Sequence, residues 1–307
     1  MKTLDPGNWP SAGRLGARGA EALGAHLPPL LVAAQRVAAT VAQGMHGRRR
    51  VGQGESFWQF RPFVEGDSIA RIDWRQSAKS DRAFVRETEW EAAQTVVLWR
   101  DPSAAMRWRS RLAPTDKHAR AGLLLLALAA LLLRGGERVS LLGHRPVMGK
   151  AGLDALADTL ARDTPEGSGL PPLAAIPRHA KLVLIGDFLS PVEEIQRRIA
   201  GFAAIPVSGH LLQVLDPAEA SLPFDGRIRF RGLPPGDVFD GSQGKAAQEM
   251  LVPRVGDIRA LYLDRLAAHQ AALAGLAATA GFSIAVHHTD RQPEAALLGL
   301  YTALNAK

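Results

Sequence analysis

The sequence of 307 residues contains no cysteine, which excludes disulfide bonds, thiolate metal sites and cysteine nucleophiles together. A chain without cysteine fits a reducing compartment, so we expect a cytoplasmic protein. Long apolar runs are also lacking: the longest, at residues 121–133, is well short of the roughly 17–25 residues that a bilayer-spanning helix needs. Residues 1–10 have no apolar core of the kind a signal peptide requires. We therefore expect no transmembrane segment.

Acidic residues are scarcer than basic ones, and the chain has a net charge of +7. The excess is local, because residues 100–150 hold ten basic and three acidic residues. Such a stretch is typical of nucleic-acid-binding proteins, so one alternative function is nucleic-acid binding through residues 100–120. Binding to phosphates would then weaken steeply with salt. Outside this stretch the charges nearly balance, and we favour a protein partner over nucleic acid.

After residue 94, short apolar runs alternate with helical patterns. The runs predict strands at residues 95–99, 138–142, 181–185, 207–215 and 282–286. Strands alternating with helices indicate an α/β fold with a doubly wound, mostly parallel sheet flanked by helices. We expect the strand at residues 95–99 to be central, between the strands that end near Gly143 and Asp187. A hairpin is predicted at residues 226–231.

The chain divides at about residue 91. Residues 92–307 are predicted to form the α/β domain. Residues 1–91 are predicted to form an N-terminal helical and irregular extension that packs on it. Residues 14–44 are predicted to form one or two helices, whereas residues 56–91 mix aromatic and charged residues without a helical period.

Two aspartates follow predicted strands, Asp101 after residues 95–99 and Asp187 after residues 181–185. Open parallel sheets bind ligands at the carboxyl ends of their strands. Asp101, Ser103 and Asp187 can therefore supply oxygen ligands to Mg²⁺. The alternative is that both aspartates only cap turns or helix N-termini.

Common catalytic motifs are missing. The sequence contains neither a Gly-x-Ser-x-Gly elbow nor a His-Glu-x-x-His helix. We therefore predict a protein that is not an enzyme. An enzyme of unrecognised type, assembled from scattered residues, is kept as a further alternative.

A dense motif precedes the strand at residues 95–99, and a second one follows it. They read Phe57-x-x-Phe60-Arg61-Pro62-Phe63, Gly66-Asp67, Arg71-Ile72-Asp73-Trp74-Arg75 and Asp101-x-Ser103-x-Ala105-Met106. These motifs resemble those of the domain-of-unknown-function-58 family. The resemblance implies a von Willebrand factor A-like fold with an extra segment before its first central strand. Genes of this family often accompany AAA+ ATPases of the MoxR type. The implied function is a non-catalytic adaptor that binds such an ATPase, and a client protein not identified by the sequence, through the loop after the central strand.

The resemblance also bears on the metal site. Metal-binding von Willebrand factor A domains carry Asp-x-Ser-x-Ser, whereas the third position here is Ala105. Thr164 is the candidate for their threonine ligand. Because one oxygen is missing and cations crowd the loop, we expect weak or absent Mg²⁺ binding at Asp101, Ser103, Thr164 and Asp187.

The cations themselves are candidates for partner binding. Arg100, Arg107 and Arg109 can meet an acidic group of a partner through the planar contact that arginine makes with carboxylates. The alternative is a solvated basic face. For the residues of the first motif we expect a structural role, with aromatic side chains packed on the sheet and arginine–aspartate pairs. They are Arg61, Gly66, Asp67, Arg71, Asp73, Trp74 and Arg75. The alternative is a protein-binding surface.

Overall fold

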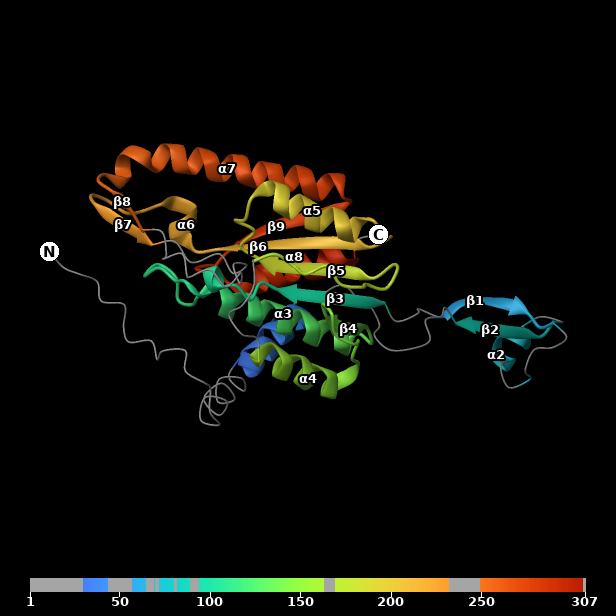
Figure 1. The fold of residues 1–307 in the computed structure, drawn as a ribbon. Coiled ribbons are helices and arrows are strands. Elements are labelled where there is room, and N and C mark those ends of the chain that lie inside the picture. Colours follow the sequence, from blue (N-terminus) through green and yellow to red (C-terminus); the bar gives the residue numbers. More distant parts are fainter. Residues whose placement is uncertain are drawn as a thin grey trace.

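The computed structural model describes residues 30–43, 57–64, 69, 72–79, 82–88, 94–162, 169–231 and 249–305. Within these residues, a five-stranded parallel sheet forms the centre of the molecule (Figure 1), in the order β4-β3-β5-β6-β9. The strands are β3 (Thr95–Arg100), β4 (Arg138–Leu141), β5 (Lys181–Gly186), β6 (Ser208–Leu215) and β9 (Phe282–His288). The predicted doubly wound parallel sheet is confirmed.

Strand β3 has the neighbours that the sequence predicts. It pairs with β4 on one side and with β5 on the other, and all six of its residues are buried. The middle strand of the five is β5, so β3 lies one place from the centre. Its continuous apolar run indicates burial on both faces, which an off-centre interior strand satisfies as well as the middle one.

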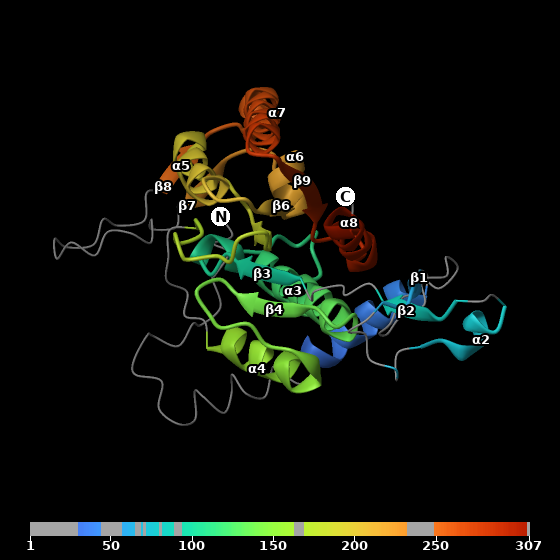
Figure 2. The ribbon, with the colours of Figure 1, turned by 90° about the vertical axis from the view of Figure 1, so that its right-hand side faces the viewer.

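Helices cover both faces of the sheet (Figure 2). Because side chains alternate along a strand, Val96 and Leu98 pack on one face and Val97 and Trp99 on the other. The first face is covered by residues 30–43, α3 (Lys117–Arg134), α4 (Gly149–Ala161) and α8 (Pro293–Asn305). The second is covered by α5 (Val192–Ala203) and α7 (Val255–Thr279).

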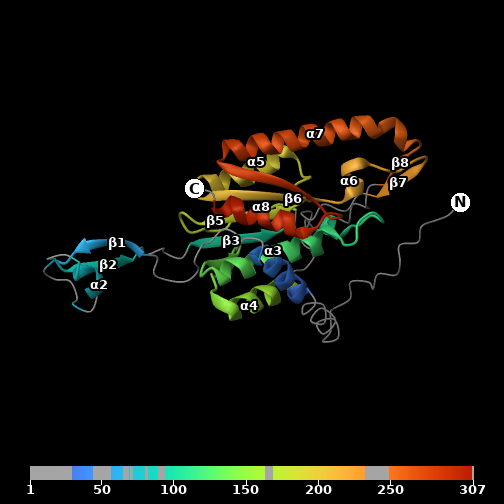
Figure 3. The ribbon, with the colours of Figure 1, turned by 180° about the vertical axis from the view of Figure 1, so that it is seen from behind.

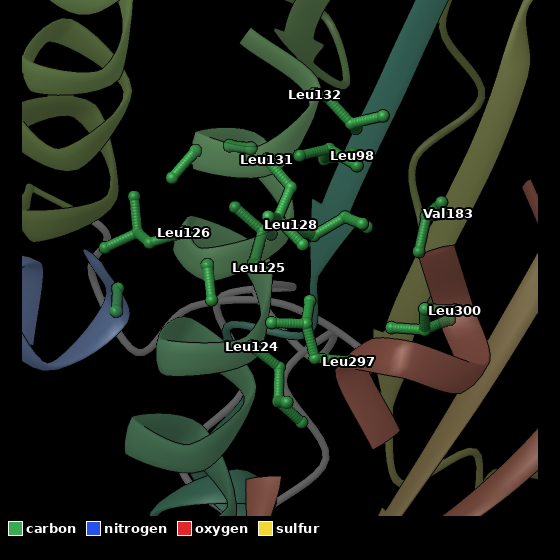
Figure 4. Packing of buried hydrophobic residues seen from close by; sticks show 14 of the residues in the cluster. Leu98, Leu124, Leu125, Leu126, Leu128, Leu131, Leu132, Val183, Leu297 and Leu300 are labelled. Carbon is green, nitrogen blue, oxygen red and sulfur yellow. The ribbon is translucent and has the colours of Figure 1, made fainter. Parts of the chain in front are cut away.

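Helix α3 is the most deeply buried helix of the first layer. Asp116 caps its N-terminus, with the side chain accepting a hydrogen bond from the Ala119 backbone N–H at 2.7 Å. Leucines of α3 such as Leu128 pack against Leu98 of β3 and Leu297 of α8 (Figure 4). A helix that is apolar on nearly all sides belongs in a core. Its first residue, Lys117, is thereby placed beneath the carboxyl edge of the sheet.

The N-terminal extension has two parts. Residues 30–43 form a helix that buries Ala34, Val37 and Ala38 in the core. Strands β1 (Phe57–Pro62) and β2 (Phe84–Thr88) pair as an antiparallel ribbon that carries the short helix α2 (Trp74–Ser77). This ribbon lies well to one side of the sheet (Figures 1 and 3). Among the described residues of the extension, it is therefore residues 30–43 that pack on the α/β domain.

A second antiparallel ribbon lies near α7. Strand β7 (Ile228–Arg231) pairs with β8 (Glu249–Val252), so the hairpin predicted within residues 226–231 is wrong. The turn signal there ends one strand, and its partner comes later in the chain. The short helix α6 (Pro217–Ser221) follows β6. In the described part of the chain, no helix combines the length and apolar character needed to cross a bilayer.

Candidate functional site

The strand order of the sheet reverses between β3 and β5. Counting these five strands along the chain, the order is 2-1-3-4-5, so the connections leave β3 and β5 in opposite directions. Such a switch point opens a crevice at the carboxyl ends of the two strands, where α/β proteins bind ligands. Asp101 follows β3 and Asp187 follows β5. The structure thus brings the two predicted aspartates together at this point.

Asp101 and Ser103 form the floor of the site. Asp101 is fully buried, and its Oδ1 accepts a hydrogen bond from the Ser103 backbone N–H at 2.8 Å. Its Oδ2 and the Ser103 Oγ are both buried without a hydrogen-bond partner of normal geometry among the described residues. Gly169 lies above them, and a Cβ at this position would come 3.5 Å from Oδ2 and 3.6 Å from Oγ. Two polar oxygens therefore face one small, covered space.

Lys117 supplies the positive charge of the site. Its side chain is 1% exposed, and its Nζ lies 3.0 Å from Asp187 Oδ2 and 2.5 Å from Glu219 Oε1. Glu219 lies on α6, where its Oε2 also accepts the backbone N–H of Asp216 at 2.8 Å in a capping box. One ammonium thus bridges the ends of β5 and β6. A buried charge is tolerated in this setting because it is paired and hydrogen-bonded.

The electrostatics follow from burial and charge pairing. Burial, and to a smaller extent Asp187, raises the pKa of Asp101 to about 6, although Ser103 and Lys117 act in the opposite direction. Burial also raises the pKa of Glu219 against the pull of Lys117. For Lys117, burial lowers the pKa, but attraction to Asp187 and Glu219 outweighs it, so the pKa lies above its usual value. The ammonium therefore stays charged at neutral pH.

A polar network extends from the site to α7. The Gln213 side chain of β6 donates to the Asp187 carbonyl at 2.9 Å and accepts from Gln270 of α7 at 3.1 Å. The Tyr262 hydroxyl donates to the Glu219 carbonyl at 2.6 Å. Two of the groups that surround Lys117 are thus held by side chains of one long helix.

The loop after β3 crosses the carboxyl edge of the sheet. We call residues 104–115 the switch-point loop. Met106 anchors it in the core, and the Ser110 backbone N–H donates to Asp216 Oδ2, at the end of β6, at 2.8 Å. Arg109 donates to the Pro114 carbonyl at 3.1 Å. Because β5 lies between β3 and β6, the loop passes over the end of β5 and over Asp187.

The basic residues of this region fall into two groups. Arg107 is half-buried beside His118, while Arg109 and Arg111 are exposed on the switch-point loop. Arg100 is buried and donates to the Leu160 carbonyl in the last turn of α4 at 3.1 Å. Arg120 is also buried.

The guanidinium of Arg120 donates to the Thr289 and Arg291 carbonyls. Arg100 and Arg120 therefore join structural elements, and of the three predicted partner-binding arginines the structure places only Arg107 and Arg109 at the surface.

The oxygens present do not fit a resident divalent cation of the kind that the fold implies. Asp187 Oδ2 is held by the Lys117 ammonium, and Ala105 offers no side-chain oxygen. Of the predicted ligand oxygens that belong to described residues, Asp101 Oδ2 and Ser103 Oγ remain, whereas Mg²⁺ requires six oxygens in near-octahedral geometry. In the described part of the chain, no three His, Cys, Asp or Glu side chains are grouped to hold a metal ion.

The other predicted residues fall into two groups, those outside the described residues and those on the β1–β2 ribbon and α2. Thr164, Gly66, Asp67 and Arg71 fall outside the described residues, as does the side chain of Arg61. Asp73 caps α2 by accepting the Gln76 backbone N–H at 2.9 Å. Trp74 is 66% exposed, so it does not pack on the sheet as expected, and Arg75 is exposed too. Asp73, Trp74 and Arg75 do not contribute to the switch-point site.

A second hollow lies at the opposite edge of the sheet. It has a volume of about 340 Å³ and is lined by His210, Ser283 and Lys181, among others. The Nδ1 of His210 lies 2.7 Å from the Ser283 Oγ across β6 and β9. The lining includes no carboxylate to orient the imidazole, as a catalytic triad requires. This pair is a cross-strand hydrogen bond between neighbouring side chains.

Sequence comparison identifies the family. A family model described as "Protein of unknown function DUF58" matches residues 59–248. The chain belongs to this family. The matched region of this DUF58 protein contains Asp101, Ser103, Lys117, Asp187 and Glu219, so the whole site lies within it. Helix α7, strand β9 and helix α8 follow it.

Two solved structures share a distant likeness with the DUF58 chain. One is a conserved hypothetical protein BatB from Bacteroides thetaiotaomicron, with 11% identity, a TM-score of 0.38, and coverage of 70% of this chain and 100% of that one. The other is an aerotolerance-related membrane protein from Bacteroides fragilis with multiple mutations to serine. It shows 12% identity, a TM-score of 0.36, and coverage of 69% and 99%. No curated protein matches the chain significantly.

Proposed function

We propose that this DUF58 protein is a non-catalytic adaptor that binds a protein partner through the switch-point loop. The observation that carries the proposal is the surface of that loop. Trp108 is 40% exposed and Leu112 is 54% exposed, and they alternate with Arg107, Arg109 and Arg111. Tryptophan and arginine are the residues most enriched at the energetic centres of protein interfaces.

The loop is also ordered before any partner binds. Its backbone is fixed at Ser110 by Asp216 and at its end by the Asp116 cap of α3. A surface held in one conformation loses less entropy on binding, so it binds more tightly for the same contacts. The loop lies at the position where α/β sheets of this topology meet ligands.

The chemistry of the loop indicates an acidic partner surface. Arginine forms bidentate hydrogen bonds with carboxylates, and Arg109 and Arg111 are exposed. The family resemblance suggests the partner class, an AAA+ ATPase of the MoxR type, with a client protein still to be identified. We propose that an acidic face of this ATPase docks on the switch-point loop.

Nucleic-acid binding by residues 100–120 is the competing function. Of the six basic residues in this stretch, Arg100, Lys117 and Arg120 are buried, which leaves Arg107, Arg109 and Arg111 to contact phosphates. An exposed leucine among them also fits a protein surface better than a phosphate backbone. This burial supports the adaptor.

The experiment reverses the loop charge with Arg107→Glu and Arg109→Glu together and measures association with the MoxR-type ATPase at low and moderate salt. We expect slower association and a weaker salt dependence, because rim charges act mainly on the on-rate. The matched control is Arg134→Glu with Arg178→Glu, which makes the same change in net charge on exposed residues at the opposite edge of the sheet. Equal effects of both pairs, or no effect of the loop pair, would show that the partner docks elsewhere.

A further inference from the structure

The Lys117 ammonium contacts Asp187, one of the residues that the sequence predicted as metal ligands. Its Nζ contacts Asp187 Oδ2 at 3.0 Å and Glu219 Oε1 at 2.5 Å, and the side chain is almost completely buried. We propose that Lys117 is a built-in cation that replaces the divalent metal, so that the site keeps its charge balance without one. The site is then permanently loaded and does not depend on the metal concentration around it.

The position of Lys117 is otherwise unfavourable. It is the first residue of α3, where the helix dipole repels cations, and its charge is removed from water. The two carboxylates offset both costs. These contacts with two carboxylates would by themselves be enough for an ordinary structural ion pair.

The other oxygens of the site point beyond a simple ion pair. Within the described part of the chain, Asp101 Oδ2 and Ser103 Oγ are buried without a hydrogen bond of normal geometry, and Ser103 and Lys117 both lower the pKa of Asp101. The ammonium thus contacts oxygens that follow β5 and β6, and two further oxygens that follow β3 lie buried nearby. The site therefore holds more buried oxygen atoms than the Lys117 ammonium contacts. This is expected of a cation site in which a lysine of the protein itself supplies the positive charge.

Two explanations for a missing metal can be separated. If the absent oxygen at Ala105 is the cause, Ala105→Ser should create a metal site. If the ammonium is the cause, Ala105→Ser should change nothing, and Lys117→Met should open the site by freeing Asp187 and Glu219. Methionine keeps the length and apolar stem of lysine without its charge.

The test titrates Mn²⁺ into the full chain, after treatment with EDTA, and follows free Mn²⁺ by its paramagnetic resonance signal. We expect no binding by the wild type or by Ala105→Ser up to millimolar Mn²⁺. Lys117→Met should bind at least about a hundredfold more tightly than the wild type, because a unit charge in contact with the ion is removed. Adding Asp101→Asn should abolish this binding. Lys150→Met removes an exposed charge and should give no gain.

A thermal unfolding series gives an independent readout. Lys117→Met should unfold at a lower temperature than the wild type in EDTA and should be stabilised by Mn²⁺, since a ligand that binds only the folded state raises its stability. The wild type should not respond. If Lys117→Met does not fold at all, the absence of binding by the wild type and by Ala105→Ser still supports the proposal. Micromolar binding of Mn²⁺ by the wild type, lost in Asp101→Asn, would overturn it, and so would a folded Lys117→Met that binds no Mn²⁺.

Discussion

Replacing Asp101 with asparagine should stabilise the protein at neutral pH and destabilise it slightly in acid, where the wild-type carboxyl is protonated. Burial, with a contribution from Asp187, raises the pKa of Asp101 from 3.8 to about 6. The folded state therefore binds a proton more tightly than the unfolded state, and the free energy of unfolding falls as the pH rises from about 4 to about 6. A pKa difference of about two units corresponds to about 3 kcal/mol.

Asparagine can keep the hydrogen bond that Asp101 Oδ1 accepts. Its carbonyl oxygen can accept the Ser103 backbone N–H that Oδ1 now accepts, and its amide can donate to the unpaired Ser103 Oγ. An imperfectly paired amide costs about 1–3 kcal/mol, which offsets part of the gain. We expect the free energy of unfolding of Asp101→Asn to exceed that of the wild type by up to about 2 kcal/mol at pH 7.5, which is the gain of about 3 kcal/mol less this cost.

Urea denaturation followed by circular dichroism between pH 4 and pH 8 measures this difference. The difference between the two proteins isolates Asp101 from other groups, such as His118, whose pKa burial lowers to about 3. The matched control is Asp158→Asn on the exposed face of α4, for which no pH-dependent difference is expected. The reasoning is refuted if Asp101→Asn is less stable than the wild type at pH 7.5, or if the difference does not depend on pH.

Two further substitutions test the local backbone. Gly169 has φ +72°, so Gly169→Ala should lower the free energy of unfolding by about 1–2 kcal/mol. Gly275→Ala, at an exposed position near the C-terminal end of α7 where a Cβ meets no other atom, should raise it by about 0.5–1 kcal/mol, and urea denaturation separates the two signs. Asp73→Ala removes the cap of α2 and should cost about 1 kcal/mol in the same assay. A loss of about 3–5 kcal/mol would instead indicate a buried arginine partner.

The fold was predictable because its signals are local. Continuous apolar runs followed by aspartate predicted both β3 with Asp101 and β5 with Asp187, and the alternation of strands and helices predicted the parallel sheet. The pairing of β7 was not predictable, because its partner β8 follows a long intervening segment. Local turn signals do not encode such a distant partner.

The candidate site was predicted only in part. In the sequence, Lys117 belongs to a basic stretch, and this pattern predicts only that its charge weakens metal binding by repulsion. Its burial depends on Glu219, which is 102 residues away in the chain. The burial of Arg100 and of Arg120 was not predicted for the same reason, since the groups that accept their hydrogen bonds are backbone carbonyls of segments distant in the chain. A count of charges along the chain gives no information about which of them find partners.

The topology of the sheet also has a consequence for how the protein folds. No two of its five strands are joined by a hairpin, and Val96 of β3 must find Lys181 of β5 before the switch point exists. Contacts this distant in sequence make folding slow, whereas the β1–β2 ribbon pairs over a short span. The chain around Lys117 therefore emerges from synthesis long before Glu219, with an ammonium that still has water as its only partner. We expect the charge of Lys117 to be buried late, in the same step that joins β5 and β6 to β3.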